Sequence, residues 1–252
     1  MNHEAGHTFL AKLGKTRLRP GGKKATDWLI NQGQFSKDKK VLEVACNMCT
    51  TSIALAKTYR CHIVAIDLNK KALEQGRKNV LNHHLEHLIE VQQANAMNLP
   101  FADNTFDIVL NEAMLTMLPE KAKQKAMSEY YRVLKPGGVL LTHDIAVVDS
   151  SKKFEIIENL SQAINVKVSP MLKQEWHQLF KRSGFSDIKI NNGAMSLMTP
   201  KGMIYDEGVK GTSKIVKNAL KKENRPMFIK MFKTFRVYKN DLNYIVHSAI
   251  KN

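Results

Sequence analysis

Short apolar runs alternate with longer amphipathic stretches through the first 150 residues. The apolar runs are predicted strands, at residues 41–44, 62–66, 89–93, 106–110 and 139–143. Helices are predicted between them, over residues 51–59, 70–83 and 120–133. Strands this short, alternating with helices, indicate βαβ units and a parallel sheet buried on both faces. Because such crossovers are right-handed, the pattern predicts an α/β fold with a Rossmann-like, doubly wound sheet.

The second half of the chain continues this pattern less regularly. Helices are predicted over residues 152–164 and 172–183, and strands over 186–190 and 242–249, which brings the sheet to seven strands. A basic, methionine-bearing and helical insertion is predicted at about residues 198–240. Residues 1–36 are predicted to form one or two short helices, broken by a turn at Arg19-Pro20-Gly21-Gly22.

Polar side chains follow several of the predicted strands. Ligands of a doubly wound sheet bind beyond the carboxyl ends of its strands. Glu43 lies on the first strand, which runs into a helix N-terminus suited to an anionic group. Asp67 ends the second strand and is placed to accept hydrogen bonds from a ribose diol, and Asn95 follows the third and can pair with an adenine edge. This set suits a nucleoside with a charged tail.

Five segments carry a resemblance to a known family. Residues 41–50, 66–67, 94–101, 106–110 and 132–138 resemble the successive motifs of class I S-adenosylmethionine (SAM)-dependent methyltransferases. The nearest group is the small-molecule branch that includes the ubiquinone and menaquinone biosynthesis C-methyltransferases, and the resemblance covers about residues 37–146. It implies a methyltransferase domain over residues 37–252, SAM as cofactor, a small-molecule acceptor and release of S-adenosylhomocysteine.

The resemblance also implies roles for individual residues. Glu43 is expected to hold the methionine end of SAM, Asp67 the ribose, and Asn95 with Ala96 the adenine. The backbone near Asn111 is expected to bind the amino acid moiety. Residues 1–36 are expected to fold over the pocket as a lid, with Arg19 meeting the carboxylate of SAM or an acidic substrate. The predicted cofactor-binding residues are Arg19, Gly21, Gly22, Glu43, Ala45, Cys46, Asn47, Asp67, Leu68, Asn95, Ala96, Met97 and Asn111.

The first motif departs from the family pattern. The family usually has glycines where this chain has Ala45, Asn47 and Cys49, because glycine allows positive φ and close backbone approach. The replacements are small or, for Asn47, tolerant of left-handed φ, so SAM binding is expected to survive. A SAM-binding protein without catalytic activity is the alternative that this departure motivates.

Cys46 and Cys49 also form a C-x-x-C at a helix N-terminus, as in thioredoxin-like redox sites. The length of the chain and its later motifs argue against a redox module. Zinc would need two more ligands at suitable spacing, so no metal site is predicted.

Two candidates for a general base follow the fourth and fifth predicted strands. Glu112 and His143 lie on the expected ligand-binding edge, where either can deprotonate a substrate. The alternatives are that His143 and Asp144 only cap loops, and that methyl transfer needs no base beyond in-line positioning of donor and nucleophile.

Composition adds the cellular setting and the partners. The chain has 252 residues, 43% of them hydrophobic, and three cysteines without a framework of pairs, which favours a cytoplasmic protein. No apolar run reaches the roughly 18 residues of a membrane span, and the N-terminus lacks the pattern of a secretory signal. The formal net charge of +16 indicates either a basic surface or a nucleic-acid partner. A nucleic-acid methyltransferase is therefore the alternative function, although residues 111–114 lack the Asn/Asp-Pro-Pro-Tyr type of motif. For the insertion three roles stay open: roof of the acceptor site, homodimer contact or RNA binding.

Overall fold

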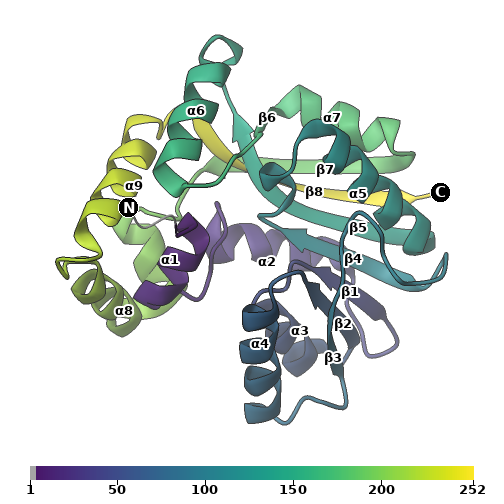
Figure 1. Ribbon diagram of the computed structural model, residues 1–252. Helices are drawn as coiled ribbons and strands as arrows, with labels where there is room; N and C mark the ends of the chain where they lie inside the picture. The colour runs from purple at the N-terminus through teal and green to yellow at the C-terminus, as the bar shows by residue number, and fades with distance from the viewer. Residues whose placement is uncertain (1–3) are drawn as a thin grey trace.

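A mostly parallel sheet forms the centre of the protein, whose computed structural model describes residues 4–252. The strand order is β3-β2-β1-β4-β5-β8-β7, and a short strand, β6, pairs with β5 beside this path. Strands β1 to β5 are mutually parallel along the path, whereas β8 runs antiparallel to both β5 and β7 (Figure 1). The predicted doubly wound α/β fold is confirmed. The strands are β1 (Lys40–Val44), β2 (His62–Asp67), β3 (Ile89–Gln93), β4 (Phe106–Glu112), β5 (Leu134–Val147), β6 (Met171–Leu172), β7 (Phe185–Ala194) and β8 (Leu242–Lys251).

Helices cover both faces of the sheet. Side chains of α2, α3 and α4 contribute to one core cluster, and those of α5 and α7 to the cluster on the opposite face. The core side chains of β1 alternate between the two clusters, with Val41 in the first and Leu42 in the second, as a strand buried on both sides requires. The helices are α1 (Gly6–Leu13), α2 (Gly22–Gly33), α3 (Thr50–Tyr59), α4 (Lys70–Asn82), α5 (Glu120–Val133), α6 (Lys153–Ile164), α7 (Lys173–Arg182), α8 (Pro200–Ala219) and α9 (Arg225–Val237).

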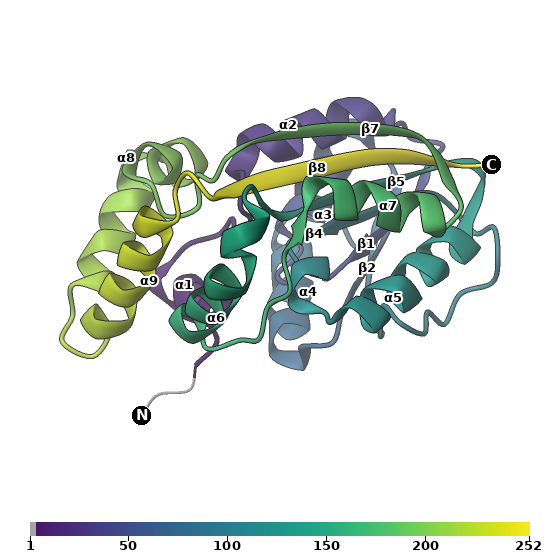
Figure 2. The same ribbon diagram turned by 90° about the horizontal axis from the view of Figure 1, so that it is seen from above.

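A third apolar core lies beyond one end of the sheet. It joins α1, α6, α8 and α9 through buried side chains such as Leu10, Leu160, Ile215 and Met231. Figures 1 and 2 both show these four helices gathered at the end toward which the parallel strands point. The N-terminal segment and the insertion at 198–240 are therefore packed together next to the edge where ligands of this fold bind.

Three predictions about the strands need correction. The sheet has an eighth strand, since β6 adds two residues beside the end of β5. Strand β4 extends through Glu112, so Asn111 and Glu112 lie in the strand rather than after it. Strand β5 likewise continues to Val147 because β8 pairs with it along its length, and His143 lies opposite Val246 inside the sheet.

Three residues of the N-terminal segment predicted as a lid, 1–3, lie outside the described residues. The rest of it forms α1 and α2, joined by a loop that contains the predicted turn. Two three-residue 3₁₀ helices, η1 (Leu115–Met117) and η2 (Ser150–Lys152), complete the elements. No helix within residues 4–252 is long and apolar enough to cross a membrane.

Candidate functional site

A cavity of about 500 Å³ opens at the carboxyl ends of β1, β2 and β4. Because β1 is flanked by β2 on one side and β4 on the other, the strand order reverses here, which is where doubly wound sheets bind ligands. The volume lies within the range of small-molecule and cofactor sites. The lining residues are His7, Thr8, Ala11, Thr16, Leu18, Arg19, Glu43, Ala45, Cys46, Asn47, Met48, Thr50, Thr51, Asp67, Asn69, Lys71, Ala72, Gln75, Glu112, Ala113, Met114 and Met117.

The loop between β1 and α3 forms one wall and has an unusual backbone. Ala45, Asn47 and Cys49 adopt φ of 59°, 49° and 61°, the left-handed conformation that normally favours glycine. The prediction that these three positions require positive φ is confirmed. Holding a non-glycine residue there costs about 1–2 kcal/mol. The chain therefore keeps the loop shape of a glycine-rich motif at a cost in stability.

A glycine elsewhere makes room for one of these replacements. Gly76 of α4 packs on the loop, and a Cβ at this position would lie 2.8 Å from Cys49 Sγ. The side chain of Cys49 thus occupies space that a side chain at position 76 would otherwise fill.

Glu43 contributes a buried carboxyl group to the cavity wall. It is 6% exposed, and its Oε2 accepts a hydrogen bond from Ser52 Oγ. Burial disfavours the carboxylate and raises the pKa of Glu43 to about 7, with Glu112 adding to the rise and the Ser52 hydrogen bond opposing it. A cationic ligand group at this wall would favour the ionised form.

Asp67 lies at the end of β2 and holds two loops in place. Its Oδ2 accepts a hydrogen bond from the backbone nitrogen of Asn47 at 3.0 Å, and its Oδ1 one from the nitrogen of Asn69 at 2.8 Å. A carboxylate can accept about four hydrogen bonds, so capacity remains for a ligand diol.

Arg19 and Glu112 face each other at the cavity wall. Arg19 Nη1 lies 2.5 Å from Glu112 Oε1, and Nη2 donates to Thr51 Oγ1 at 2.9 Å. Burial alone would raise the pKa of Glu112, but the Arg19 charge and hydrogen bonds from His143 and Thr26 outweigh it and hold this pKa at about 2. Glu112 is therefore a permanent carboxylate engaged by Arg19, which makes it a poor general base.

His143 does not reach the cavity, and its prediction as a general base needs correction. Its ring is fully buried, with Nδ1 3.0 Å from Glu112 Oε2, while Nε2 accepts a hydrogen bond from the backbone nitrogen of Gly21 at 2.9 Å. Burial lowers the pKa of His143, and Glu112 opposes this. Nε2 thus attaches the N-terminal turn to β5, while Nδ1 links β5 to Glu112 of β4.

Gly21 and Gly22 also lie outside the cavity lining, and each is closely packed by a neighbouring side chain. A Cβ on Gly21 would lie 2.6 Å from the ring of Tyr244, and one on Gly22, whose φ is +56°, would lie 2.4 Å from Asp206 Oδ1. The turn thus needs glycine so that the sheet and α8 can approach closely.

The remaining predicted positions are not among the lining residues. Asn111 is fully buried, and its Nδ2 donates to the Val44 carbonyl at 3.2 Å. Asn95 Oδ1 accepts from the backbone nitrogen of Met97 within its own loop. Ala96 and Met97 pack against the core, and Leu68 is 60% exposed.

The two cysteines of the C-x-x-C pack against each other. Cys46 Sγ and Cys49 Sγ are 3.8 Å apart, and both side chains are buried. The hydrogen bond with Cys49 and burial raise the pKa of the Cys46 thiol. No group of three or more possible metal ligands occurs in the described part of the chain.

Sequence reasoning missed the contribution of α1. His7 of α1 lines the cavity, but the sequence predicts residues 1–36 only as a lid, and a histidine without a metal-ligand pattern indicates only surface polarity. Burial lowers the pKa of His7, and Asp67 opposes this shift.

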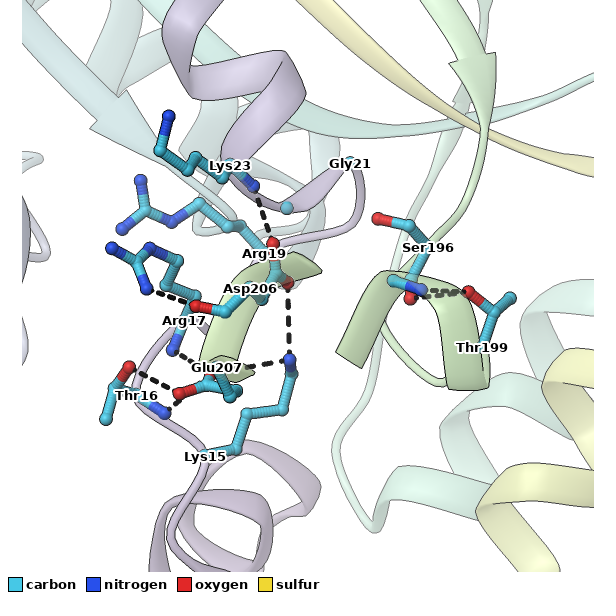
Figure 3. Close-up of polar contacts among 12 residues, drawn as sticks. Lys15, Thr16, Arg17, Arg19, Gly21, Lys23, Ser196, Thr199, Asp206 and Glu207 are labelled. Carbon is cyan, nitrogen blue, oxygen red and sulfur yellow. Dashed lines mark hydrogen bonds and ion pairs between the residues drawn. The ribbon is translucent and has the colours of Figure 1, made fainter. Parts of the chain in front are cut away.

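Polar contacts fasten the N-terminal segment to α8 (Figure 3). Lys15 Nζ lies 3.3 Å from Asp206 Oδ2 and 3.6 Å from Glu207 Oε1, and all three side chains are buried. Thr16 also donates to Glu207 through both its nitrogen and its hydroxyl. The N-terminal segment and the insertion therefore form one body above the cavity.

Comparisons with known proteins agree with this geometry. Residues 41–138 match a family described as "Methyltransferase domain". An uncharacterized protein of Haemophilus influenzae is 58% identical over 242 residues, 96% of each chain. A demethylmenaquinone methyltransferase of Lactiplantibacillus plantarum is 32% identical over 142 residues, which cover 56% of this chain and 57% of that protein.

A solved structure shares the fold. The Haemonchus contortus phosphoethanolamine N-methyltransferase 2, in complex with phosphomonomethylethanolamine and S-adenosylhomocysteine, superposes with a TM-score of 0.78 at 19% identity, covering 98% of this chain and 57% of that one. The chain thus spans little more than half the length of both named methyltransferases.

Proposed function

Since this chain belongs to the class I SAM-dependent methyltransferase family, we propose that it transfers the methyl group of SAM to a small-molecule acceptor. The observation that carries the proposal is the cavity at the strand-order reversal, with Glu43 and Asp67 in its lining. Its size suits one cofactor together with the reacting end of a small acceptor.

The residues present fit SAM. Glu43 would hold the ammonium group of the methionine end, and the loop from Ala45 to Cys49 would present backbone N–H groups to its carboxylate. Asp67 would accept hydrogen bonds from the ribose hydroxyls. When bound, SAM supplies an electrophilic methyl group.

The protein's part in the reaction is positioning. Glu112 is engaged by Arg19, and His143 is buried with both nitrogens engaged, so neither is free to take a proton from the acceptor. Holding donor and nucleophile in line supplies much of the rate acceleration in such transfers. Residues of the N-terminal segment, among them His7 and Arg19, line the cavity, and on this side they would keep water away from the acceptor.

The first test is calorimetric binding of SAM and S-adenosylhomocysteine to wild type, Asp67→Ala and Glu86→Gln. Glu86 is an exposed acid outside the cavity lining and serves as control. Wild type and Glu86→Gln should bind alike, and Asp67→Ala should bind at least about ten-fold more weakly, because it loses hydrogen bonds to the ligand and the support of its loop. No binding to wild type at millimolar SAM would refute the proposal.

The second test is turnover. SAM incubated with the protein and a metabolite extract depleted of macromolecules should yield S-adenosylhomocysteine. Turnover only with RNA, and with a steep salt dependence, would favour the nucleic-acid alternative instead.

A further inference from the structure

A second, smaller cavity of about 50 Å³ adjoins the first beneath the N-terminal segment. Four residues line both cavities: His7, Leu18, Ala113 and Met117. The two spaces thus meet at one junction, on the side of the cofactor cavity that faces α1 and η1. A ligand group in the small cavity is therefore adjacent to the cofactor cavity.

The small cavity is apolar. Of its fifteen lining residues, only His7 and Thr116 have polar side-chain atoms. Thr116 is 1% exposed, and its hydroxyl accepts a hydrogen bond from the backbone nitrogen of Ile145. Water needs two to four polar partners to be held in such a space, and these walls do not offer them. The occupant that fits is an apolar group.

The walls come from parts of the chain outside the matched methyltransferase segment. Leu10 belongs to α1, Leu160 to α6, and Met231 and Phe235 to α9. The segment that matches the family, residues 41–138, contributes only the floor at the junction, through Ala113, Thr116 and Met117. This chain's own additions therefore shape the cavity.

We infer that the acceptor carries a short apolar group that occupies this cavity, while the atom to be methylated lies at the junction beside His7. The inference rests on the proposed function and adds to it a substrate class. A water molecule needs about 10–15 Å³ measured in the same way, so the space holds a group of roughly three to five heavy atoms, such as a branched alkyl chain. Burial lowers the pKa of His7, which leaves its ring neutral near pH 7 and able to accept a hydrogen bond from the acceptor.

The cavity can be probed without knowing the acceptor. Met117 and Met231 line it, whereas Met127 is fully buried in a different core cluster and serves as internal control. With ¹³C-methyl-methionine protein saturated with S-adenosylhomocysteine, isobutanol should shift the Met117 and Met231 signals saturably and leave Met127 unchanged. Glycerol, of similar size but polar, should shift none of the three. Equal effects of glycerol and isobutanol, or no saturable shift with isobutanol, would overturn the inference.

Two phenylalanines of α9 provide a matched pair of variants. Phe235 lines the cavity, while Phe232, on the same helix and also partly buried, does not. Phe235→Ala should enlarge the space and admit longer branched alcohols, with affinity rising about four-fold for each added methylene. Phe232→Ala should keep the wild-type preference, and an equal change in both variants would contradict the assignment.

Failure of the proposed function and failure of the apolar acceptor site give different experimental results. Loss of S-adenosylhomocysteine binding by wild type would refute the proposed function. Normal S-adenosylhomocysteine binding together with an unresponsive Met231 would refute only the apolar acceptor site. The wild-type titration needs no variant, so the inference stays testable even where Phe235→Ala does not fold.

Discussion

The protonation of Glu43 should control the affinity for the cofactor. Its buried carboxyl group has a pKa of about 7, raised chiefly by burial. An ammonium group binds the carboxylate and not the neutral acid, so affinity falls as the pH drops through this value. Between pH 7 and pH 6 the ionised fraction falls from about 50% to about 9%, which predicts about five-fold weaker binding of S-adenosylhomocysteine.

Titration calorimetry at pH 6.0, 6.5 and 7.0 measures this directly. In this window the α-amino group of the ligand stays mostly protonated, because its pKa lies above 7. Repeating the titration in buffers of different ionisation enthalpy should reveal release of about half a proton per ligand bound at pH 7.

Two variants isolate the responsible group. Glu43→Gln should bind more weakly and lose the slope, because its amide does not titrate. His7→Gln should keep the slope, although His7 lines the same cavity and a histidine has a reference pKa of about 6.5, within this window. A change of less than two-fold in wild type, or an undiminished slope in Glu43→Gln, would refute the reasoning.

Three further predictions concern stability. Gly76→Ala should lower the free energy of unfolding by about 1–3 kcal/mol through its clash with Cys49 Sγ, and this loss should shrink in a Cys49→Gly background, as urea denaturation of the double-mutant cycle would show. Lys15→Met should lower the free energy of unfolding by about 3–5 kcal/mol in thermal or urea denaturation, because Asp206 would stay buried without its cation. The control Lys12→Met removes an exposed ion pair with Glu4 and should change the free energy of unfolding little. Burial lowers the pKa of His247 to about 3 in the folded protein, whereas the pKa in the unfolded chain is about 6.5. Below pH 6.5 the unfolded chain therefore binds a proton that the folded protein does not. The free energy of unfolding should fall by about 2–3 kcal/mol between pH 6.5 and 4.5. His247→Phe should flatten that acid limb in denaturation curves, and an unchanged limb would contradict the assignment.

The sheet could be predicted from sequence because its strands are buried on both faces and are mostly apolar, with a single acid in each of the two runs named next. Val41–Val44 and Phe106–Leu110 are such runs, and each is part of an observed strand. The two-residue β6 has no such signal. The extension of β5 past His143 depends on pairing with β8, about 100 residues away, which local pattern does not carry.

The candidate site could be predicted only in part, because polar side chains near it can bond to other protein groups instead of a ligand. Glu43 and Asp67 line the cavity, as the sequence motifs suggested. His143 and Asn111 occupy positions at the expected edge, yet both ring nitrogens of His143 bond to Glu112 and Gly21, and Asn111 Nδ2 donates to the Val44 carbonyl. Which partner satisfies a buried polar group is a matter of tertiary contacts, and a motif does not encode it.

The N-terminal segment lines both the cofactor and the acceptor cavities and is bound to α8 by buried charges. Lys15 lies between α1 and the turn that carries Arg19, and its charge is buried against two carboxylates of α8. Asn218, at the other end of α8, donates to the Leu13 carbonyl of α1. Pulling α1 away from α8 would leave buried charges without partners, so the two are expected to move together. Arg19 in this body faces the cofactor cavity, and Leu10 faces the apolar one. Because the same N-terminal segment lines both cavities, we expect binding of the cofactor and of the acceptor to be energetically coupled.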